Sequence, residues 1–208
     1  LNTERLIALV NQLLDFRRME SGTLQFHPEL FSLSDALNTL VEVFYPAIQG
    51  RHLKLATDIP PGITITADRD LVGKMMANLL SNALKYAASY IDLRLSADDT
   101  DVTVVVANDG NIVPLGQREE IFQPFSRYTP TDPSDPTTVS GTGLGLSLLR
   151  TLAERHRGTA CMDDDMSVNR FILRLPKSHP LPVATENDRL EILAETSEKT
   201  PSVPRSGE

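Results

Sequence analysis

The sequence predicts an α+β fold, because its helical stretches alternate with pairs of β-rich runs rather than with single strands. Residues 90–97 and 101–108 are two β-rich runs, YIDLRLSA and DVTVVVAN, separated by the turn residues DDT. Runs this close in sequence pair as a hairpin. Two further runs, around 159–163 and over 169–176, end the pattern. A doubly wound parallel sheet would need a helix after each strand.

The first part of the chain predicts a helix, a short extended piece and a second helix. Residues 3–20 carry apolar side chains at helical spacing. This amphipathic helix packs on its own domain or is half of an antiparallel pair whose partner lies upstream. An extended piece over 26–31 leads to Ser32 and Ser34, either of which suits the N-cap of a helix that ends near Gln49.

The middle of the chain predicts two strands and a long helix. Residues 52–59 and 63–67 alternate polar and apolar side chains around the turn Pro60–Pro61–Gly62, which predicts that the two strands pair with each other. Asp68 suits the N-cap of a helix over 69–87. Its apolar residues form two adjacent rows, so it should pack on the sheet.

The last part predicts a loop, a helix, the final two strands and a linker. Residues 126–140 hold Pro, Thr, Ser and Asp, a composition that builds no core and predicts a mobile loop. Helix resumes within 141–156. Residues 177–208 are Pro-containing and acidic, and we expect a disordered linker there.

Composition narrows the class of protein. Hydrophobic residues make up 40% and charged residues 23% of the 208 residues, which is typical of a soluble globular protein. The net charge of −8 and the lack of a basic stripe argue against a nucleic-acid surface. No apolar run is long enough to span a membrane, and the lone Cys161 makes no internal disulfide, so we expect a cytoplasmic fragment without direct membrane contact.

Three stretches carry residues suited to binding a phosphorylated ligand. In the long helix, Asn78, Asn82 and Lys85 share one face. An amide oxygen on this face could coordinate Mg²⁺ and an ammonium group could bind phosphate. The alternative is a polar face that is only solvated. The segment 108–114, NDGNIVP, places a glycine after a strand, which alone indicates only a turn. The run 140–147, SGTGLGLS, sets glycines before a helix start that favours phosphate, although a glycine-capped helix without ligand has the same pattern.

In this order, the stretches resemble the sequence boxes of sensor histidine kinases. NLLSNALKY is similar to the N box, NDGNIVP to the first glycine box, IFQPF to the phenylalanine box and GTGLGLS to the second glycine box. The resemblance covers about residues 1–176 and implies the two-layer α/β sandwich, or Bergerat fold, shared with gyrase, Hsp90 and MutL. It implies three parts: residues 1–22 as the end of the dimerisation and phosphotransfer domain, 23–176 as the ATP-binding domain and 177–208 as the linker. This favours an upstream partner for the first helix.

The resemblance also implies roles for individual residues. Asn82 would coordinate Mg²⁺, and Asn78, Lys85 and Arg127 would act on the phosphates. Phe122 and Phe125 would anchor the base of an ATP lid in the core. The remaining nucleotide contacts are expected at Tyr86, Asn108, Asp109, Gly110, Phe125, Gly141, Thr142, Gly143, Leu144 and Gly145.

The sequence departs from the family pattern in two places. The family's adenine-binding Asp aligns with Asn108, and the second glycine of the first glycine box is Ile112. In addition, no histidine of the chain has the phosphoacceptor setting, so we expect the acceptor on an upstream helix. Gyrase-like hydrolysis is disfavoured, because Asn78 stands where those ATPases carry a Glu and an amide takes up no proton at neutral pH.

The expected function is transfer of the γ-phosphate of Mg-ATP to that upstream histidine in two-component signalling. Its partners would be a second copy through the upstream helical domain and a response regulator or downstream receiver domain. The parent protein would then be a sensor, with an inner-membrane location left open. Two alternatives are a serine kinase of the same ATPase superfamily and a non-catalytic nucleotide-binding or dimerising module.

Overall fold

The computed structural model describes residues 14, 17, 25–128 and 142–178. In chain order the elements are β1 (Pro28–Ser32), α2 (Leu33–Gly50), β2 (Lys54–Asp58), β3 (Thr64–Asp68), α3 (Arg69–Tyr86), β4 (Tyr90–Ala97), β5 (Asp101–Asn108), the short 3₁₀ helices η1 (Leu115–Gln117) and η2 (Glu120–Phe122), α4 (Gly145–Arg155), β6 (Thr159–Met162) and β7 (Asn169–Pro176). Leu14 and Arg17, the described residues of the first expected helix, are helical.

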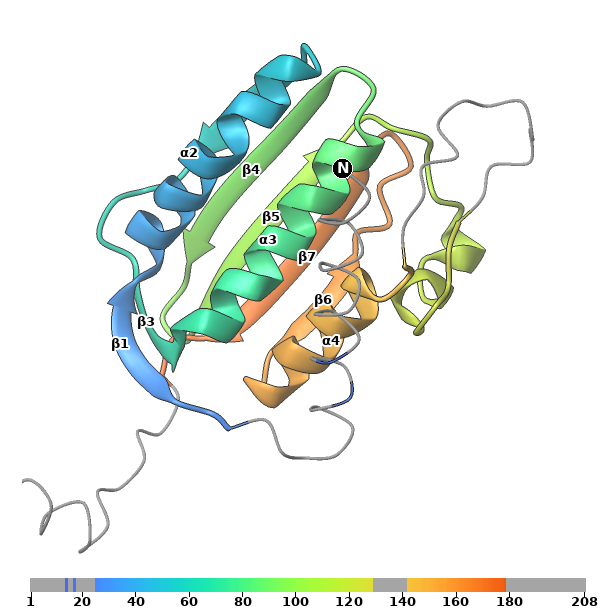
Figure 1. The fold of residues 1–208 in the computed structure, drawn as a ribbon. Coiled ribbons are helices and arrows are strands. Elements are labelled where there is room, and N and C mark those ends of the chain that lie inside the picture. The colour runs from blue at the N-terminus through green and yellow to red at the C-terminus, as the bar shows by residue number, and fades with distance from the viewer. Residues whose placement is uncertain (1–13, 15–16, 18–24, 129–141, 179–208) are drawn as a thin grey trace, which may run out of the picture.

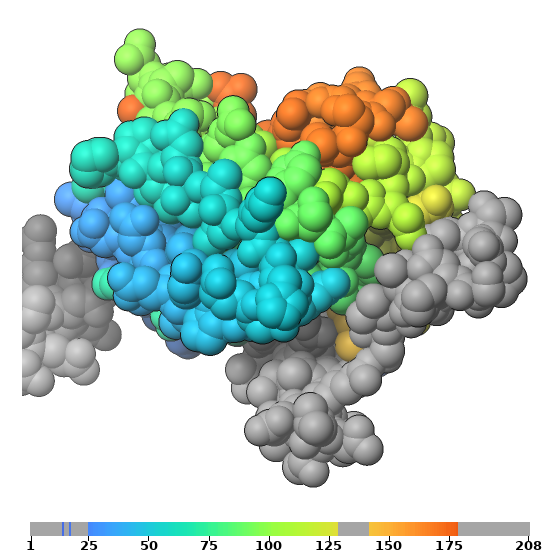
Figure 2. All heavy atoms as spheres, turned by 90° about the horizontal axis from the view of Figure 1, so that it is seen from above, coloured from blue at the N-terminus to red at the C-terminus, as the bar shows by residue number. Residues whose placement is uncertain are grey.

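The molecule has two layers, a mixed sheet and a layer of helices. The large sheet has the order β2-β4-β5-β7-β6, with β2 parallel to β4 and the other neighbours antiparallel. Helices α2, α3 and α4 cover one face of this sheet (Figure 1). Figure 2 shows that α2 and the η1–η2 segment lie on opposite sides of the molecule. The α+β prediction, with helices on one face of a mixed sheet, is confirmed.

The helix starts confirm two predicted caps. The N–H of Asp35 donates to Ser32 Oγ at 3.1 Å, so Ser32 rather than Ser34 caps α2. The N–H of Leu71 donates to Asp68 Oδ1 at 3.0 Å, so Asp68 caps α3 as predicted. These side chains satisfy donors that a helix start leaves without an intrahelical partner.

The expected hairpin around Pro60–Gly62 is wrong. Both strands exist, but β2 pairs parallel with β4, whereas β3 pairs antiparallel with β1 in a separate two-stranded sheet. The buried Ser34 explains the course of the chain, because its hydroxyl donates to Pro60 O at 2.7 Å and accepts from Ile63 N at 3.0 Å. The start of α2 thus holds the turn in place between the two sheets.

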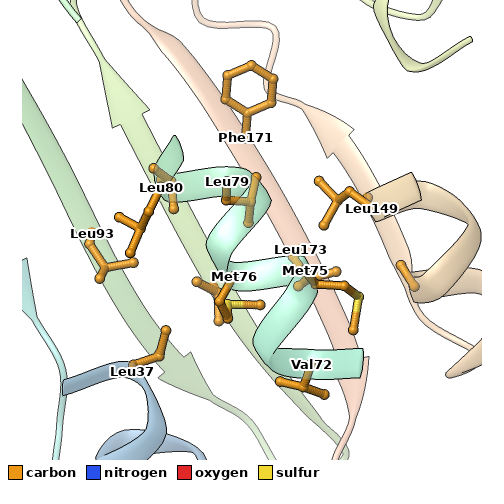
Figure 3. Close-up of a cluster of buried hydrophobic side chains, with 14 of the residues drawn as sticks. Leu37, Val72, Met75, Met76, Leu79, Leu80, Leu93, Leu149, Phe171 and Leu173 are labelled. Atoms are coloured by element: carbon orange, nitrogen blue, oxygen red, sulfur yellow. The ribbon is translucent and has the colours of Figure 1, made fainter. Parts of the chain in front are cut away.

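The core lies between the helices and the large sheet. Met75 and Leu79 of α3 are fully buried, and they pack beside Leu149 of α4 and Leu173 of β7 (Figure 3). This burial confirms the two apolar rows predicted on α3 and fixes the orientation of its polar face. Among the described residues, no helix is both long and apolar enough to cross a bilayer.

Candidate functional site

The polar face of α3 is half-buried and carries the residues expected from the sequence. Asn78, Asn82 and Lys85 lie on it. At its end, Lys85 Nζ donates to the hydroxyl of Tyr86 at 2.7 Å and lies 4.4 Å from the centre of the Tyr86 ring. The tyrosine therefore holds the ammonium group at the last turn of α3.

The N-terminus of α4 faces this polar surface. A Cβ atom on Gly145, the first residue of α4, would lie 3.2 Å from Asn78 Oδ1. The residue before it, Leu144, makes no side-chain cap, and the first helical hydrogen bond runs from Leu148 N to Leu144 O at 2.9 Å. The N–H groups of the first turn consequently point out of the helix end, where they and the helix dipole favour an anion.

Residues 142–144 shape the approach to α4. The hydroxyl of Thr142 accepts from Leu144 N at 3.1 Å, and that of the buried Ser147 donates to Leu144 O at 2.9 Å. Gly143 has a φ of 72°, a left-handed conformation that suits glycine. Gly141 and most of the expected lid, residues 129–140, lie outside the described residues.

The loop after β5 packs against the end of α3. A Cβ atom on Gly110 would lie 1.9 Å from the backbone oxygen of Tyr86, so only glycine permits this approach. Asn108, at the end of β5, is 1% exposed, and its Nδ2 lacks a hydrogen-bond partner among the described residues. A buried unpaired donor is unfavourable unless a ligand satisfies it.

Asp109 has a structural task in this site. Its carboxylate accepts from the backbone N–H groups of Ala88, Ser89 and Tyr90 and from the Ser89 hydroxyl. Burial by itself would raise the pKa of Asp109, but the hydrogen bonds from Ser89 and Tyr90 outweigh it and lower the pKa to about 2. Asp109 thus holds the chain between α3 and β4.

Asn169 is a site residue that sequence reasoning missed. It is the first residue of β7, is buried and pairs in register with Asn108. Its Oδ1 accepts from Val113 N at 3.0 Å, and its Nδ2 donates to Asn111 O at 2.9 Å. The strand register is the signal that connects it with the loop after β5, and the register needs the sheet order, which the local pattern does not contain.

The two phenylalanines expected at the base of the lid behave differently. Phe122 is 3% exposed and packs in the core as expected. The expectation for Phe125 is wrong, because its side chain is 63% exposed and its φ is 64°. The N–H of Phe125 donates to Gly143 O at 3.0 Å, and a Cβ atom on Gly143 would lie 2.7 Å from the carbonyl carbon of Phe125. The backbones of Phe125 and Gly143 are thus in close contact while the Phe125 side chain is exposed, and Arg127, two residues on, is also exposed.

The arrangement fits a magnesium nucleotide. Uncapped N–H groups at α4 and the Lys85 ammonium suit phosphates, while Gly110 and the unpaired Asn108 amide suit a flat polar group. The described residues contain no group of three or more His, Cys, Asp or Glu side chains that would hold a metal by themselves. The Asn82 oxygen is the metal ligand expected from the sequence, and phosphate oxygens and water would complete the coordination of Mg²⁺.

Comparisons with known proteins agree with this fold. The catalytic domain of the histidine kinase ThkA superposes with a TM-score of 0.64 and 25% identity, over 75% of this chain and all of that domain. ShkA, solved at full length with AMPPNP, gives a TM-score of 0.71 and 23% identity, over 86% of this chain and 38% of ShkA. The class defined by the fold is therefore that of histidine kinase catalytic domains.

Sequence relatives give the family. The family described as histidine kinase-, DNA gyrase B- and HSP90-like ATPase matches residues 67–179, and the chain belongs to it. The sensor protein KdpD of Escherichia coli is 30% identical over 162 residues, which cover 76% of this chain and 17% of KdpD. The sensor protein RstB of the same organism is 29% identical over 182 residues, 87% of this chain and 41% of RstB. The chain thus spans less than half the length of these two relatives, and the resemblance to sensor histidine kinases is confirmed.

Proposed function

We propose that this chain binds Mg-ATP and presents its γ-phosphate to a histidine on an upstream helix, as the catalytic part of a two-component sensor kinase. The observation that carries the proposal is the uncapped N-terminus of α4 directly facing the Asn78 amide on α3. Helix-end N–H groups opposite an amide and ammonium face form a site for a metal-bound polyphosphate.

Each part of the site has its own task in this proposal. Asn82 would hold Mg²⁺, Asn78 and Lys85 would orient the phosphates, and Arg127 would add positive charge. The base would lie near Asn108, between the loop after β5 and Tyr86. Bound ATP would supply the electrophilic phosphoryl group, while the protein supplies position and charge compensation.

The chemistry of Asn78 favours a kinase over a hydrolase. Asn78 lies beside the start of α4, where a carboxylate would be needed to take a proton from water. An amide cannot do so, and the bound nucleotide would therefore persist until an acceptor nitrogen arrives. The same feature suits a serine kinase of this superfamily, so the identity of the phosphorylated residue separates the two.

We infer the partners from the family. A sensor kinase would form a homodimer through its upstream helical domain and pass the phosphoryl group to a response regulator or a downstream receiver domain. ThkA, whose complex with the response regulator TrrA has a TM-score of 0.67 and 22% identity to this chain, is one solved example of such a pairing.

Calorimetry of nucleotide binding tests the proposal. Asn82→Ala should weaken ATP binding at least about tenfold in the presence of Mg²⁺, because a metal ligand is lost. Without Mg²⁺, mutant and wild type should bind ATP with similar, weaker affinity. Ser81→Ala is the matched control, since Ser81 is the exposed neighbour on α3 and should leave the affinity unchanged.

Two outcomes would contradict the proposal. Equal affinities for the wild type and Asn82→Ala, with and without Mg²⁺, would remove Asn82 from the metal site. A wild-type protein that binds ATP but supports no transfer to any residue when the upstream helix is present would favour the non-catalytic module, whereas transfer to serine would favour the serine kinase.

A further inference from the structure

Arg118 is a buried arginine that none of the expected roles uses. It follows η1 and is 5% exposed, although arginine is rarely buried without partners. Among the described residues, its side-chain partners belong to two segments, the loop after β5 and the turn between β6 and β7. Its Nε donates to Val113 O at 3.1 Å, its Nη1 to Asp163 O, and its Nη2 to Asp165 O at 2.9 Å and to Met166 Sδ at 3.3 Å.

The local structure explains how Arg118 reaches both segments. Gln117 N donates to Pro114 O at 2.9 Å and Arg118 N to Leu115 O at 3.2 Å, so the η1 turn folds Arg118 back over Val113. Its acceptors are backbone carbonyls, which have fixed positions. A planar guanidinium holds several such acceptors at once, which a lysine ammonium on a flexible stem does less well.

Val113 is held from both sides by groups outside its own loop. Arg118 binds its carbonyl, and Asn169 accepts from its N–H at 3.0 Å. Asn169 also binds Asn111 O at 2.9 Å, and Gly110 lies against Tyr86 O at the end of α3. The loop over 110–113 is therefore fixed at both ends and through its middle.

We propose that Arg118 is a positioning residue that fixes the 110–113 loop against the β6–β7 turn and so preorganises the part of the site that receives the nucleotide base. This inference rests on the proposed binding of ATP, and in it Arg118 acts through the 110–113 loop rather than by contact with the nucleotide. Fixing a loop in its binding conformation raises affinity because less freedom is lost on binding. Removing Arg118 should weaken base recognition and leave phosphate recognition intact.

The test compares Arg118→Met and Arg118→Lys with Arg170→Met. Arg170 contacts the same β6–β7 turn, through ion pairs to Asp163 at 2.7 Å and Asp165 at 3.2 Å, and its described hydrogen bonds do not reach Val113. Two quantities are measured for each protein: amide hydrogen exchange over 110–113 without nucleotide, and the affinities for ATP and for magnesium tripolyphosphate. Thermal unfolding reports the general stability.

Arg118→Met should speed hydrogen exchange of the Val113 amide about tenfold and lower the affinity for ATP about tenfold. Its affinity for magnesium tripolyphosphate should stay within about twofold of the wild-type value. Arg118→Lys should recover part of both losses, because lysine reaches fewer carbonyls, and Arg170→Met should change neither quantity beyond about twofold.

Several results would overturn the inference. These are unchanged exchange in Arg118→Met, equal effects of Arg118→Met and Arg170→Met, or equal loss of ATP and tripolyphosphate affinity. If Arg118→Met does not fold, Arg118→Lys decides, since wild-type exchange and affinity in that variant would show that the guanidinium is not needed. A wild type that binds no ATP would contradict the proposed function, and the exchange measurement without nucleotide would still decide the role of Arg118.

Discussion

Asn108 is the residue at which nucleotide choice should be decided. Its Nδ2 is buried without a partner among the described residues, and an amide side chain can present either its oxygen or its nitrogen to a ligand. Adenine presents an amino group and guanine a carbonyl oxygen at the same edge, and an amide can pair with both. Asp109 has little capacity to take over this task, because its carboxylate already holds Ser89 and Tyr90.

We therefore expect Asn108→Asp to sharpen the preference for ATP over GTP by about tenfold, mainly by weakening GTP. An ionised carboxylate can only accept hydrogen bonds, so it pairs with the amino group of adenine but not with the carbonyl oxygen of guanine. A hydrogen bond to a charged acceptor contributes about 1.5–3 kcal/mol, whereas one to a neutral acceptor contributes about 1 kcal/mol. Asn108→Ala should lower the affinity for ATP. Competition binding of both nucleotides to the three proteins measures this. An unchanged ratio in Asn108→Asp would mean that the base is recognised elsewhere.

Asp109 makes stability depend on pH in a defined direction. Its pKa in the folded protein is about 2, below the ordinary value of 3.8, because its hydrogen bonds favour the charged form. The resulting stabilisation is complete above about pH 4 and is lost as the pH falls toward about 2. Asp109→Asn should therefore be less stable than wild type near neutral pH, and the difference should shrink below about pH 4.

Urea unfolding of both proteins across this pH range is the measurement. Asp58→Asn is the control, because Asp58 is an exposed residue at the end of β2, and this variant should show no such trend. A difference between wild type and Asp109→Asn that stays constant down to about pH 2 would show that the carboxylate charge is not what holds Ser89 and Tyr90.

At the scale of elements, the sequence predicts which segments form helices and strands better than it predicts their neighbours. The helix over 69–87 is found within one residue as α3, because its cap and its apolar rows are local signals. The predicted pairing of β2 with β3 is wrong, because alternating side chains and turn residues do not indicate which sheet a strand joins. Ser34, which holds the turn between them, resembles a cap in sequence.

The candidate site also has parts that the sequence predicts and parts that it does not. The polar face of α3 and the glycines before α4 could be predicted, because helical periodicity and glycine positions are local. Asn169 and Arg118 could not, since their partners lie 56 and 45 residues away, in Val113 and Asp163 respectively. The exposed side chain of Phe125, its φ of 64° and its backbone contact with Gly143 could not be predicted either, because no side-chain pattern indicates them.

Two glycines of the α3 region should respond in opposite ways to alanine. Gly73 is an exposed position within α3, and a Cβ atom there would meet nothing within 4 Å. Gly73→Ala should stabilise the protein by about 0.5–1 kcal/mol, because alanine loses less backbone freedom on folding. Gly110→Ala should cost about 1–3 kcal/mol, since its Cβ would strike Tyr86 O and force the main chain to move.

Denaturant unfolding of the two variants measures these changes, and ATP affinity separates stability from function. Gly73→Ala should bind ATP like the wild type, whereas a folded Gly110→Ala should bind it more weakly, because the loop after β5 is displaced from α3. Wild-type stability and affinity in Gly110→Ala would mean that this loop tolerates a shift and does not shape the site.

At the scale of the whole molecule, the three histidines that the structure describes are badly placed to accept a phosphoryl group. His156 is 1% exposed, its Nδ1 is 2.7 Å from Leu152 O, and its ring packs on Phe26 with centroids 4.8 Å apart. The backbone N–H of His27 donates to Asp68 at the start of α3. At 1.5 Å per residue, Asp68 lies about 21 Å along the helix axis from Asn82. His52 lies in the turn after α2 with a φ of 55°, outside any helix, and His179 is outside the described residues.

We therefore expect this chain by itself to acquire no acid-labile, base-stable phosphate from labelled ATP, although it binds the nucleotide. A histidine must reach the γ-phosphate in line, and a buried ring or one anchored at the far end of α3 cannot do so without unfolding its contacts. Adding the upstream helix should restore labelling, and Asn82→Ala in that longer protein should abolish it. Labelling of the chain alone, mapped to His52 or His179 by peptide analysis and lost on replacing that histidine, would show that the acceptor lies within these residues and that no upstream helix is needed.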